Sequence, residues 1–219
     1  NTITAGAWSA GGNMGTARYN AGGAGIQTAA LGFAGSTYPS PPTVATEEYN
    51  GSSWTAGGNL NTAKLGPFGF GTQTAAVSAA GQSPASFTQT TEEYDGSSWT
   101  TVNNMATAGR RNGDAVGILT AGVAFGGNLV SGYTNATEEY DGTNWTGGGN
   151  LTTARESFQA AGTLTAALAS GGYSGSYTSD VEEYNGTAWS EVNNLPATRG
   201  FGSGSGIQTN ALIFAGNAG

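Results

Sequence analysis

The sequence contains no cysteine and no histidine. Without cysteine there is no disulfide framework, and the redox compartment stays open. Without histidine the chain lacks the commonest general base and metal ligand near neutral pH, and any Ser–His catalytic arrangement is excluded. No apolar run approaches the ~18 residues that a membrane-spanning helix needs. We therefore expect no cofactor and no membrane insertion.

Charge is also scarce, and most of it is negative. Charged residues make up 9% of the chain and the net charge is −8, which disfavours a nucleic-acid backbone as a partner. Glycine, at 39 of 219 residues, could by itself indicate disorder, but 8 Phe, 9 Tyr and 5 Trp supply enough aromatic surface for a core. We expect an ordered single domain over residues 1–219, built from short strands and tight turns.

Three sequence elements repeat in phase along the chain. The tryptophans are spaced by 46, 45, 46 and 44 residues, at Trp8, Trp54, Trp99, Trp145 and Trp189. A segment of the type GIQTAALGFAG begins at Gly25, Gly71, Gly117, Gly162 and Gly206. The third element, TEEYNGSSW or a close variant, ends at the last four tryptophans. This period is typical of propeller blades and of some helical repeats, so the content of each unit must decide between them.

Each unit is predicted to form four strands. An Asn-Gly or Asp-Gly pair separates Tyr from Trp at residues 50–51, 95–96, 141–142 and 185–186, which predicts a tight hairpin. The short apolar run that ends in glycine, such as residues 29–35, is typical of a strand buried on both faces. The glycine-rich stretch before it predicts the innermost strand, where crowding near an axis favours residues without side chains. These contents favour an all-β fold.

The order of Trp, Leu or Met, a Thr-Ala-Arg-like segment, an apolar strand and a Glu-x-Tyr strand resembles the kelch repeat over nearly the whole chain. Only Gly126-Gly127 and Gly171-Gly172 keep the double glycine of that repeat. The variant TEEYNGSSW followed by GGNLNTAK is similar to repeats of bacteriophage virion proteins. The resemblance implies a β-propeller on a virion or extracellular surface, with the basic repeat position on a ligand-binding face.

The predicted fold is a five-bladed β-propeller of four-stranded antiparallel blades. The first Trp has no EEY strand before it, and the chain stops where a fifth EEY strand would begin. We expect C-terminal strands around residues 202–207 and 210–215 to pair with an N-terminal strand around residues 5–10. Such pairing closes the ring and removes exposed strand edges.

All six basic residues occupy one repeat position, 10 to 12 residues after a Trp, and eight of the fourteen acids form Glu-Glu pairs. Two interpretations stay open. One is a basic–Glu pair in every blade that cements neighbouring blades, which the equal rhythm of the glutamates favours. The other is a cationic ring at one mouth of the channel that binds an anion or acidic glycan, formed by Arg18, Lys64, Arg110, Arg155 and Arg199.

Other repeated residues have similar alternatives. Tryptophan could stack on sugars, but its place in every hairpin favours packing between blades. The turn Asn and Asp residues could suggest calcium, but one carboxylate per turn is too few hard ligands. The loops between the second and third strands vary most, at residues 36–45, 82–89, 128–135 and 173–179. Their aromatic residues are the candidate ligand-binding positions, namely Tyr38, Phe87, Tyr133, Tyr173 and Tyr177.

The function predicted from these features is non-enzymatic. Five-bladed glycosidases need two or three carboxylates that converge on the axis, and the acids outside the repeat, such as Asp114 and Glu156, show no obvious convergence. We expect a receptor- or glycan-binding module of a phage virion or tail fibre, with a protein or glycan partner on a host or virion surface. The alternative is a structural module that decorates or cements a larger assembly, with homo-oligomer formation within it.

Overall fold

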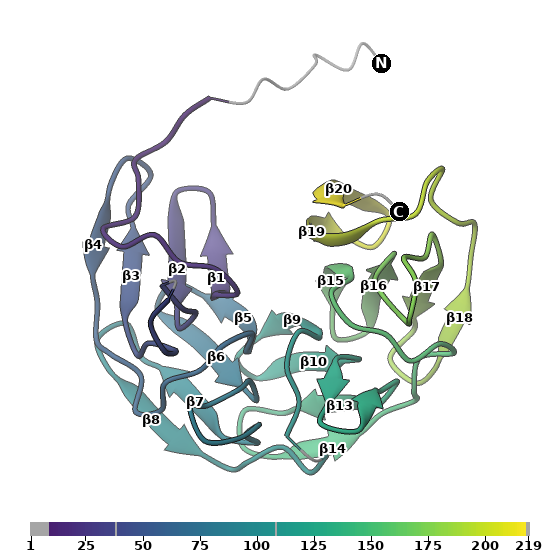
Figure 1. Cartoon of the computed structure of the whole chain (residues 1–219), viewed down its shortest axis with the longest axis horizontal. Coiled ribbons are helices and arrows are strands. Elements are labelled where there is room, and N and C mark those ends of the chain that lie inside the picture. The colour runs from purple at the N-terminus through teal and green to yellow at the C-terminus, as the bar shows by residue number, and fades with distance from the viewer. Residues whose placement is uncertain (1–8, 38, 108, 218–219) are drawn as a thin grey trace.

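The computed structural model describes residues 9–37, 39–107 and 109–217. The chain forms antiparallel sheets that stand side by side in an open horseshoe (Figure 1). Four of these sheets have four strands each, and we number them blades 1 to 4 in chain order. This confirms the predicted all-β class and the four-stranded antiparallel repeat unit.

The strands follow the repeat. Blade 1 holds β1 (Gly22–Ile26), β2 (Ala29–Phe33), β3 (Thr46–Tyr49) and β4 (Trp54–Ala56), and blade 2 holds β5 (Phe68–Thr72), β6 (Ala75–Ala79), β7 (Thr91–Tyr94) and β8 (Trp99–Val102). Blade 3 holds β9 (Asp114–Ile118), β10 (Ala121–Phe125), β13 (Thr137–Tyr140) and β14 (Trp145–Gly147). Blade 4 holds β15 (Gln159–Thr163), β16 (Ala166–Ser170), β17 (Val181–Tyr184) and β18 (Trp189–Glu191). The fifth sheet has β19 (Gly200–Ile207) and β20 (Asn210–Asn217), and a small loop hairpin has β11 (Asn128–Leu129) and β12 (Gly132–Tyr133).

The predicted hairpins between Tyr and Trp are confirmed, with a loop of four residues. Tyr49 is the partner of Trp54 in the β3–β4 register. The side-chain oxygen of Asn50 accepts the N–H groups of Ser52 and Ser53 at 3.0 and 2.9 Å, and Gly51 has a φ of 93°, which glycine adopts without strain. In blade 2 the same backbone bonds lower the pKa of Asp95 to about 2. The side-chain oxygens of Asn50 and Asp95 therefore stabilise the turn, as expected if these residues recur because the hairpin turn needs them.

The innermost strands are crowded, as the glycine pattern predicts. A Cβ atom on Gly69 of β5 would lie 2.6 Å from the carbonyl oxygen of Gly23 in β1, and one on Gly204 of β19 would lie 2.2 Å from that of Ala160 in β15. Both distances are too short for a real side chain. The five innermost strands together line a central channel of about 580 Å³.

The hydrophobic core lies between blades, and three of the tryptophans, Trp99, Trp145 and Trp189, are part of it. Trp99 of blade 2 packs 4.9 Å from the ring of Phe33 in blade 1, and its indole N–H donates to the hydroxyl of Thr46 at 3.0 Å. Trp145 and Trp189 make the equivalent bonds to Thr91 and Thr137. These three side chains are buried, which supports packing over sugar stacking. Trp8 lies outside the described residues.

A belt of backbone hydrogen bonds joins the blades around one mouth of the channel. Its members are equivalent residues with φ between 47° and 61°, namely Asn20, Gly66, Asn112, Ser157 and Phe201. Each later member donates its N–H to the carbonyl of the member before it, at 2.8, 3.0, 2.7 and 2.7 Å. We call this the mouth belt. Among the described residues no bond joins Asn20 to Phe201, where the horseshoe is open.

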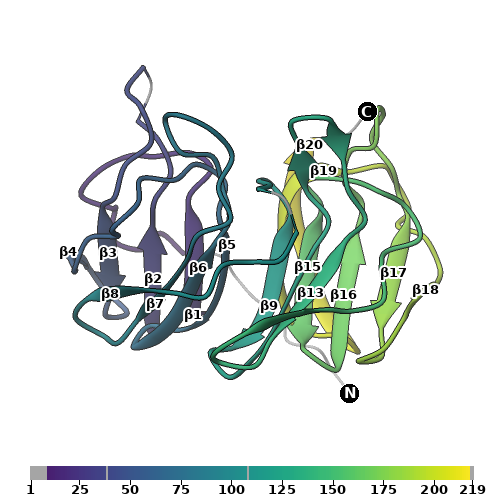
Figure 2. The same ribbon diagram turned by 90° about the horizontal axis from the view of Figure 1, so that it is seen from below.

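The strands run between two ends of the molecule (Figure 2). At the hairpin end, the turns within β1–β2 and β3–β4 meet, and a Cβ on Gly51 would contact Thr28 at 3.5 Å. At the loop end lie the mouth belt and the connections from second to third strands. The predicted C-terminal strands fall within β19 and β20 and pair with each other, Gly202 opposite Ala215. Most of the predicted strand around residues 5–10 lies outside the described residues, and Ser9 and Ala10 are not in a strand.

Candidate functional site

Four of the five predicted cationic site residues lie inside the blades, paired with the first Glu of each Glu-Glu pair. Arg18 pairs with Glu47, Lys64 with Glu92 at 3.2 Å, Arg110 with Glu138 at 3.3 Å and Arg155 with Glu182 at 3.1 Å. In every pair the side chains are at most 8% exposed. The pairing of basic residues with glutamates is as the first interpretation expects, but each ion pair lies within one blade and does not join neighbouring blades.

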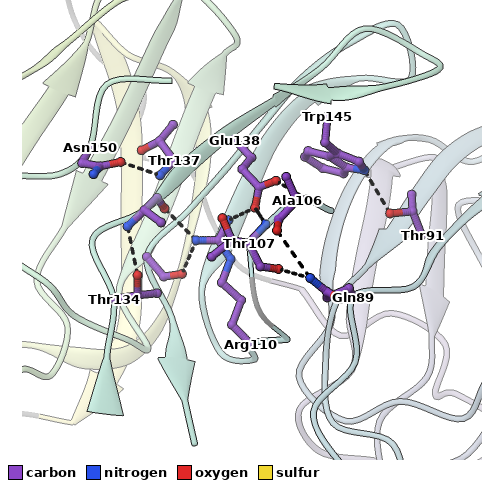
Figure 3. A network of polar contacts seen from close by, with 12 residues as sticks. Gln89, Thr91, Ala106, Thr107, Arg110, Thr134, Thr137, Glu138, Trp145 and Asn150 are labelled. Carbon is purple, nitrogen blue, oxygen red and sulfur yellow. Dashed lines mark hydrogen bonds and ion pairs between the residues drawn. The ribbon is translucent and has the colours of Figure 1, made fainter. Parts of the chain in front are cut away.

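Figure 3 shows the polar contacts around Arg110 and Glu138. Arg110 donates to the carbonyls of Gly126 and Ala136 at 3.2 and 2.7 Å. Glu138 accepts the N–H groups of Ala106 and Thr107 at 2.7 and 3.2 Å. The connection between blades 2 and 3 is thereby tied to β13. Burial lowers the pKa of Arg110 to about 10 and that of Lys64 to about 8, because desolvation penalises the charged form.

In three of the four Glu-Glu pairs, the second Glu bonds to the next blade. Tyr94 donates its hydroxyl to Glu48 at 2.5 Å, Tyr140 donates to Glu93 at 2.6 Å, and Tyr184 donates to Glu139 at 2.5 Å. Burial, and then the bond to Glu48, raises the pKa of Tyr94 to about 12. The alternation of side chains along a strand thus sends one Glu to a cation within the blade and the other across the blade junction.

Residues that break the repeat gather instead at the loop end. The residue after each of the four ion-paired basic residues bridges to the loop of its own blade, in the pairs Tyr19–Ser36, Leu65–Gln82, Arg111–Asn128 and Glu156–Tyr173. Each loop then folds back, so that these loop residues pair in turn with Pro42, Phe87, Tyr133 and Tyr177. We call these twelve residues the loop ladder. Backbone bridges fix its position on each blade, while most of its side chains differ from blade to blade, tyrosine recurring at Tyr133 and Tyr177.

Loop-ladder side chains also contact one another across blade junctions. The Arg111 guanidinium donates to the Gln82 side-chain oxygen and lies 5.3 Å from the centre of the Phe87 ring. Glu156 accepts hydrogen bonds from Asn112 and Asn128 at 3.1 and 3.4 Å.

An aromatic row extends along the same end. Ring centres are 5.8 Å apart for Tyr133 and Tyr173, 5.4 Å for Tyr173 and Tyr177, and 6.3 Å for Tyr177 and Phe201. The three tyrosines are half-buried and Phe201 is 52% exposed. Rings held edge to face in this way form a preorganised surface that can contact a ligand at little cost in side-chain entropy.

The structure therefore places the predicted site residues in different environments. Phe87, Tyr133, Tyr173 and Tyr177 all lie on the loop ladder, and the three tyrosines are in contact. Tyr38 lies outside the described residues. Arg199 is exposed and, in the part of the chain that the structure describes, forms no ion pair. Whether any of these residues binds a ligand stays a prediction.

Sequence reasoning missed four of the twelve ladder residues. Tyr19, Leu65, Arg111 and Glu156 follow the basic residues directly, and only their pairing with distant loops makes them part of this surface. A signal was present, since Arg111 is the extra cation of the repeat and Glu156 is an acid outside the Glu-Glu pairs. Reading the repeat column by column would have shown that the position after the basic residue never holds the same residue twice.

The central channel offers little chemistry by comparison. Its lining is mostly glycine and small residues, and Asp114 is the single ionisable residue among the described residues that line it. The carboxylate accepts the N–H groups of Ala115 and Ala160 at 2.9 and 3.1 Å. Burial raises its pKa to about 6. This group joins the innermost strands of blades 3 and 4.

The described residues form neither a metal site nor a membrane-spanning helix. They contain no group of three or more acidic residues placed to hold a metal ion, and they form no helix long and apolar enough to cross a membrane. In the comparisons with known proteins, no family model matches the chain and no curated protein matches it. The chain is an all-β protein of repeated four-stranded antiparallel sheets.

Proposed function

We propose that this protein is a non-enzymatic binding module that recognises a surface glycan through its loop end, on a virion or other extracellular surface. One observation carries the proposal. The residues that repeat are engaged in pairs within and between blades, whereas the residues that vary lie together on the loop ladder. A rigid scaffold that presents variable aromatic and amide side chains is the usual arrangement of a recognition surface.

The test is glycan binding by matched variants. Wild-type protein is screened on a glycan array, and the hits are titrated by calorimetry. Tyr173→Ala and Tyr177→Ala should weaken binding at least tenfold, because each removes a ring from the aromatic row. Tyr49→Phe, a change at the hairpin end, should leave affinity unchanged. An array without any saturable hit would contradict the proposal.

We also propose that the horseshoe closes into a five-bladed propeller, with the N-terminal strand completing the fifth sheet. Support comes from groups that form hydrogen bonds at other junctions but, among the described residues, have no partner at the open one. Gln73 and Gln208 each donate to two carbonyls of the preceding blade, while the equivalent Gln27 is exposed. The mouth belt likewise needs one more bond, from the N–H of Asn20 to the carbonyl of Phe201.

Cysteine pairs test this closure, because the chain has no cysteine of its own. Asn20→Cys with Phe201→Cys should form an intramolecular disulfide as readily as Asn112→Cys with Ser157→Cys, a pair that belt bonds already hold close. Asn20→Cys with Asn112→Cys, on non-adjacent blades, serves as the negative control. Only intermolecular disulfides from the first pair would contradict closure.

A second candidate function is structural, as a module that cements a larger assembly or a homo-oligomer. The observation that favours it is at the hairpin end, where equivalent residues Ile26, Ile118 and Ile207 are 68%, 55% and 54% exposed. Exposed apolar residues around one mouth suit a flat contact. Sedimentation of wild type and of the triple Ile→Ser variant distinguishes the functions, since an assembly contact of about 1,000 Å² or more would give oligomers in the wild type alone.

A further inference from the structure

Arg111 differs from the buried cations beside it. Arg110, its neighbour in the chain, pairs with Glu138. Arg111 has no carboxylate partner within residues 9–37, 39–107 and 109–217. Its polar partner is the neutral Gln82 side chain, and the face of Phe87 lies beneath the guanidinium. Its Nε atom is buried and has no hydrogen-bond partner among the same residues.

The position of Arg111 follows from local backbone geometry. Successive residues of an extended segment point to opposite sides, so Arg110 enters the blade and Arg111 joins the loop ladder, where it bridges Asn128. Phe87 and Gln82 of blade 2 then hold the guanidinium in place. A positioned guanidinium presents its remaining N–H donors in a fixed fork that matches a carboxylate.

The neighbouring ladder residues suit the rest of a sugar. The side-chain amide of Asn128 and the carboxylate of Glu156 lie next along the ladder and are bonded to each other. Amides and a carboxylate are the groups that bind sugar hydroxyls by hydrogen bonding. Tyr133, paired with Asn128 in the loop hairpin, supplies an apolar ring of the kind that packs on a pyranose.

We propose that Arg111 is the anion-recognising residue of the loop end, and that the ligand is an oligosaccharide with a carboxylate-bearing sugar. The sugar carboxylate binds the guanidinium, and the hydroxyls of the same or the next sugar bind Asn128 and Glu156. The inference rests on the proposed glycan-binding function and names its substrate class. In a chain of net charge −8, selection for an anion must come from a specific cation such as this one, because the overall field is repulsive.

The experiment uses ligands that differ only in the charged group. Acidic oligosaccharides carrying glucuronic, galacturonic or sialic acid are each compared with their carboxyl-reduced, neutral counterparts. Wild-type protein should bind at least one acidic member tenfold or more tightly than its reduced form. Arg111→Gln should abolish that preference while leaving affinity for the reduced form unchanged. Tyr49→Phe, the control at the hairpin end, should keep the preference.

The outcomes separate the inference from the function on which it rests. Equal binding of acidic and reduced ligands, or an unchanged preference in Arg111→Gln, would overturn the role of Arg111 and leave glycan binding intact. Absence of binding to every ligand, acidic, reduced or neutral, would overturn both. Thermal unfolding of Arg111→Gln is measured alongside, and Arg111→Lys tests whether charge alone, without the planar fork, restores part of the preference.

Discussion

The body of the blades and their loop end follow opposite rules. In the body, equivalent positions hold the same residue and make the same contact, as with the tyrosine–glutamate bonds of three successive junctions. At the loop end, equivalent positions are held by the same backbone bridges, but most of them carry different side chains. The difference teaches that one repeat can supply a scaffold and a variable surface together, because the backbone pairing of the ladder does not depend on side-chain identity.

Changes in the two regions should therefore have different effects on stability. The predictions that follow test this, from the largest expected effect on stability to the smallest.

Glu138→Ala should destabilise the protein most. The change leaves Arg110 buried without its counter-ion and the N–H groups of Ala106 and Thr107 without their acceptor. Loss of one partner of a buried pair typically costs about 3–5 kcal/mol. Urea denaturation followed by tryptophan fluorescence measures the loss. A change below about 1 kcal/mol would contradict the assignment of this pair to the body.

Tyr94→Phe should lower the free energy of unfolding by about 1–2 kcal/mol, since it removes a hydrogen bond to a charged acceptor, Glu48. Tyr49 occupies the same repeat position and has no hydroxyl hydrogen bond among the placed residues. Tyr49→Phe is thus the matched control and should change stability by less than about 0.5 kcal/mol. Equal effects of the two changes would mean that the junction bond contributes nothing.

Asp114→Asn should change how stability depends on pH. The folded-state pKa is about 6, against 3.8 for the unperturbed group, so the folded state binds the proton more tightly. Stability therefore falls as pH rises from about 4 to 6 and stays lower at pH 7. Each unit of pKa shift corresponds to about 1.4 kcal/mol, so between pH 4 and pH 7 the variant should gain about 2 kcal/mol of stability relative to wild type. Thermal unfolding across this range checks the sign, and a variant less stable at pH 7 than at pH 4 relative to wild type would refute it.

Tyr177→Ala should have the smallest effect on folding and a large one on binding. The half-buried ring touches Tyr173 and Phe201 at the loop end and is not part of a core cluster between blades. We expect a loss of at most about 1 kcal/mol in thermal unfolding. A loss of stability comparable to that expected for Glu138→Ala would mean that the aromatic row supports the fold as strongly as the buried ion pairs do. That result would contradict the contrast between the body of the blades and the loop end.

The sequence predicted the repeat unit well because its signals are local. Gly51 must adopt a positive φ beside Asn50, and the innermost glycines must admit a neighbouring strand, so both patterns could be recognised without tertiary information. The sequence left the environment of the basic residues open, because their contacts are with residues distant in the chain. Whether Lys64 faces a channel mouth or Glu92 depends on residues almost 30 positions away, and only the burial of both side chains decides it.

The sequence by itself determined the strands, the turns and the five-fold rhythm, because hydrogen-bonded hairpins and glycine-lined inner strands depend on residues close together in the chain. It also identified the aromatic loop residues Phe87, Tyr133, Tyr173 and Tyr177. Only the tertiary structure showed that Arg111 and Glu156 join them, since that surface is assembled by pairing between segments far apart in sequence. Adjacent residues such as Arg110 and Arg111 thus have opposite environments, because the backbone turns one side chain inward and the next outward.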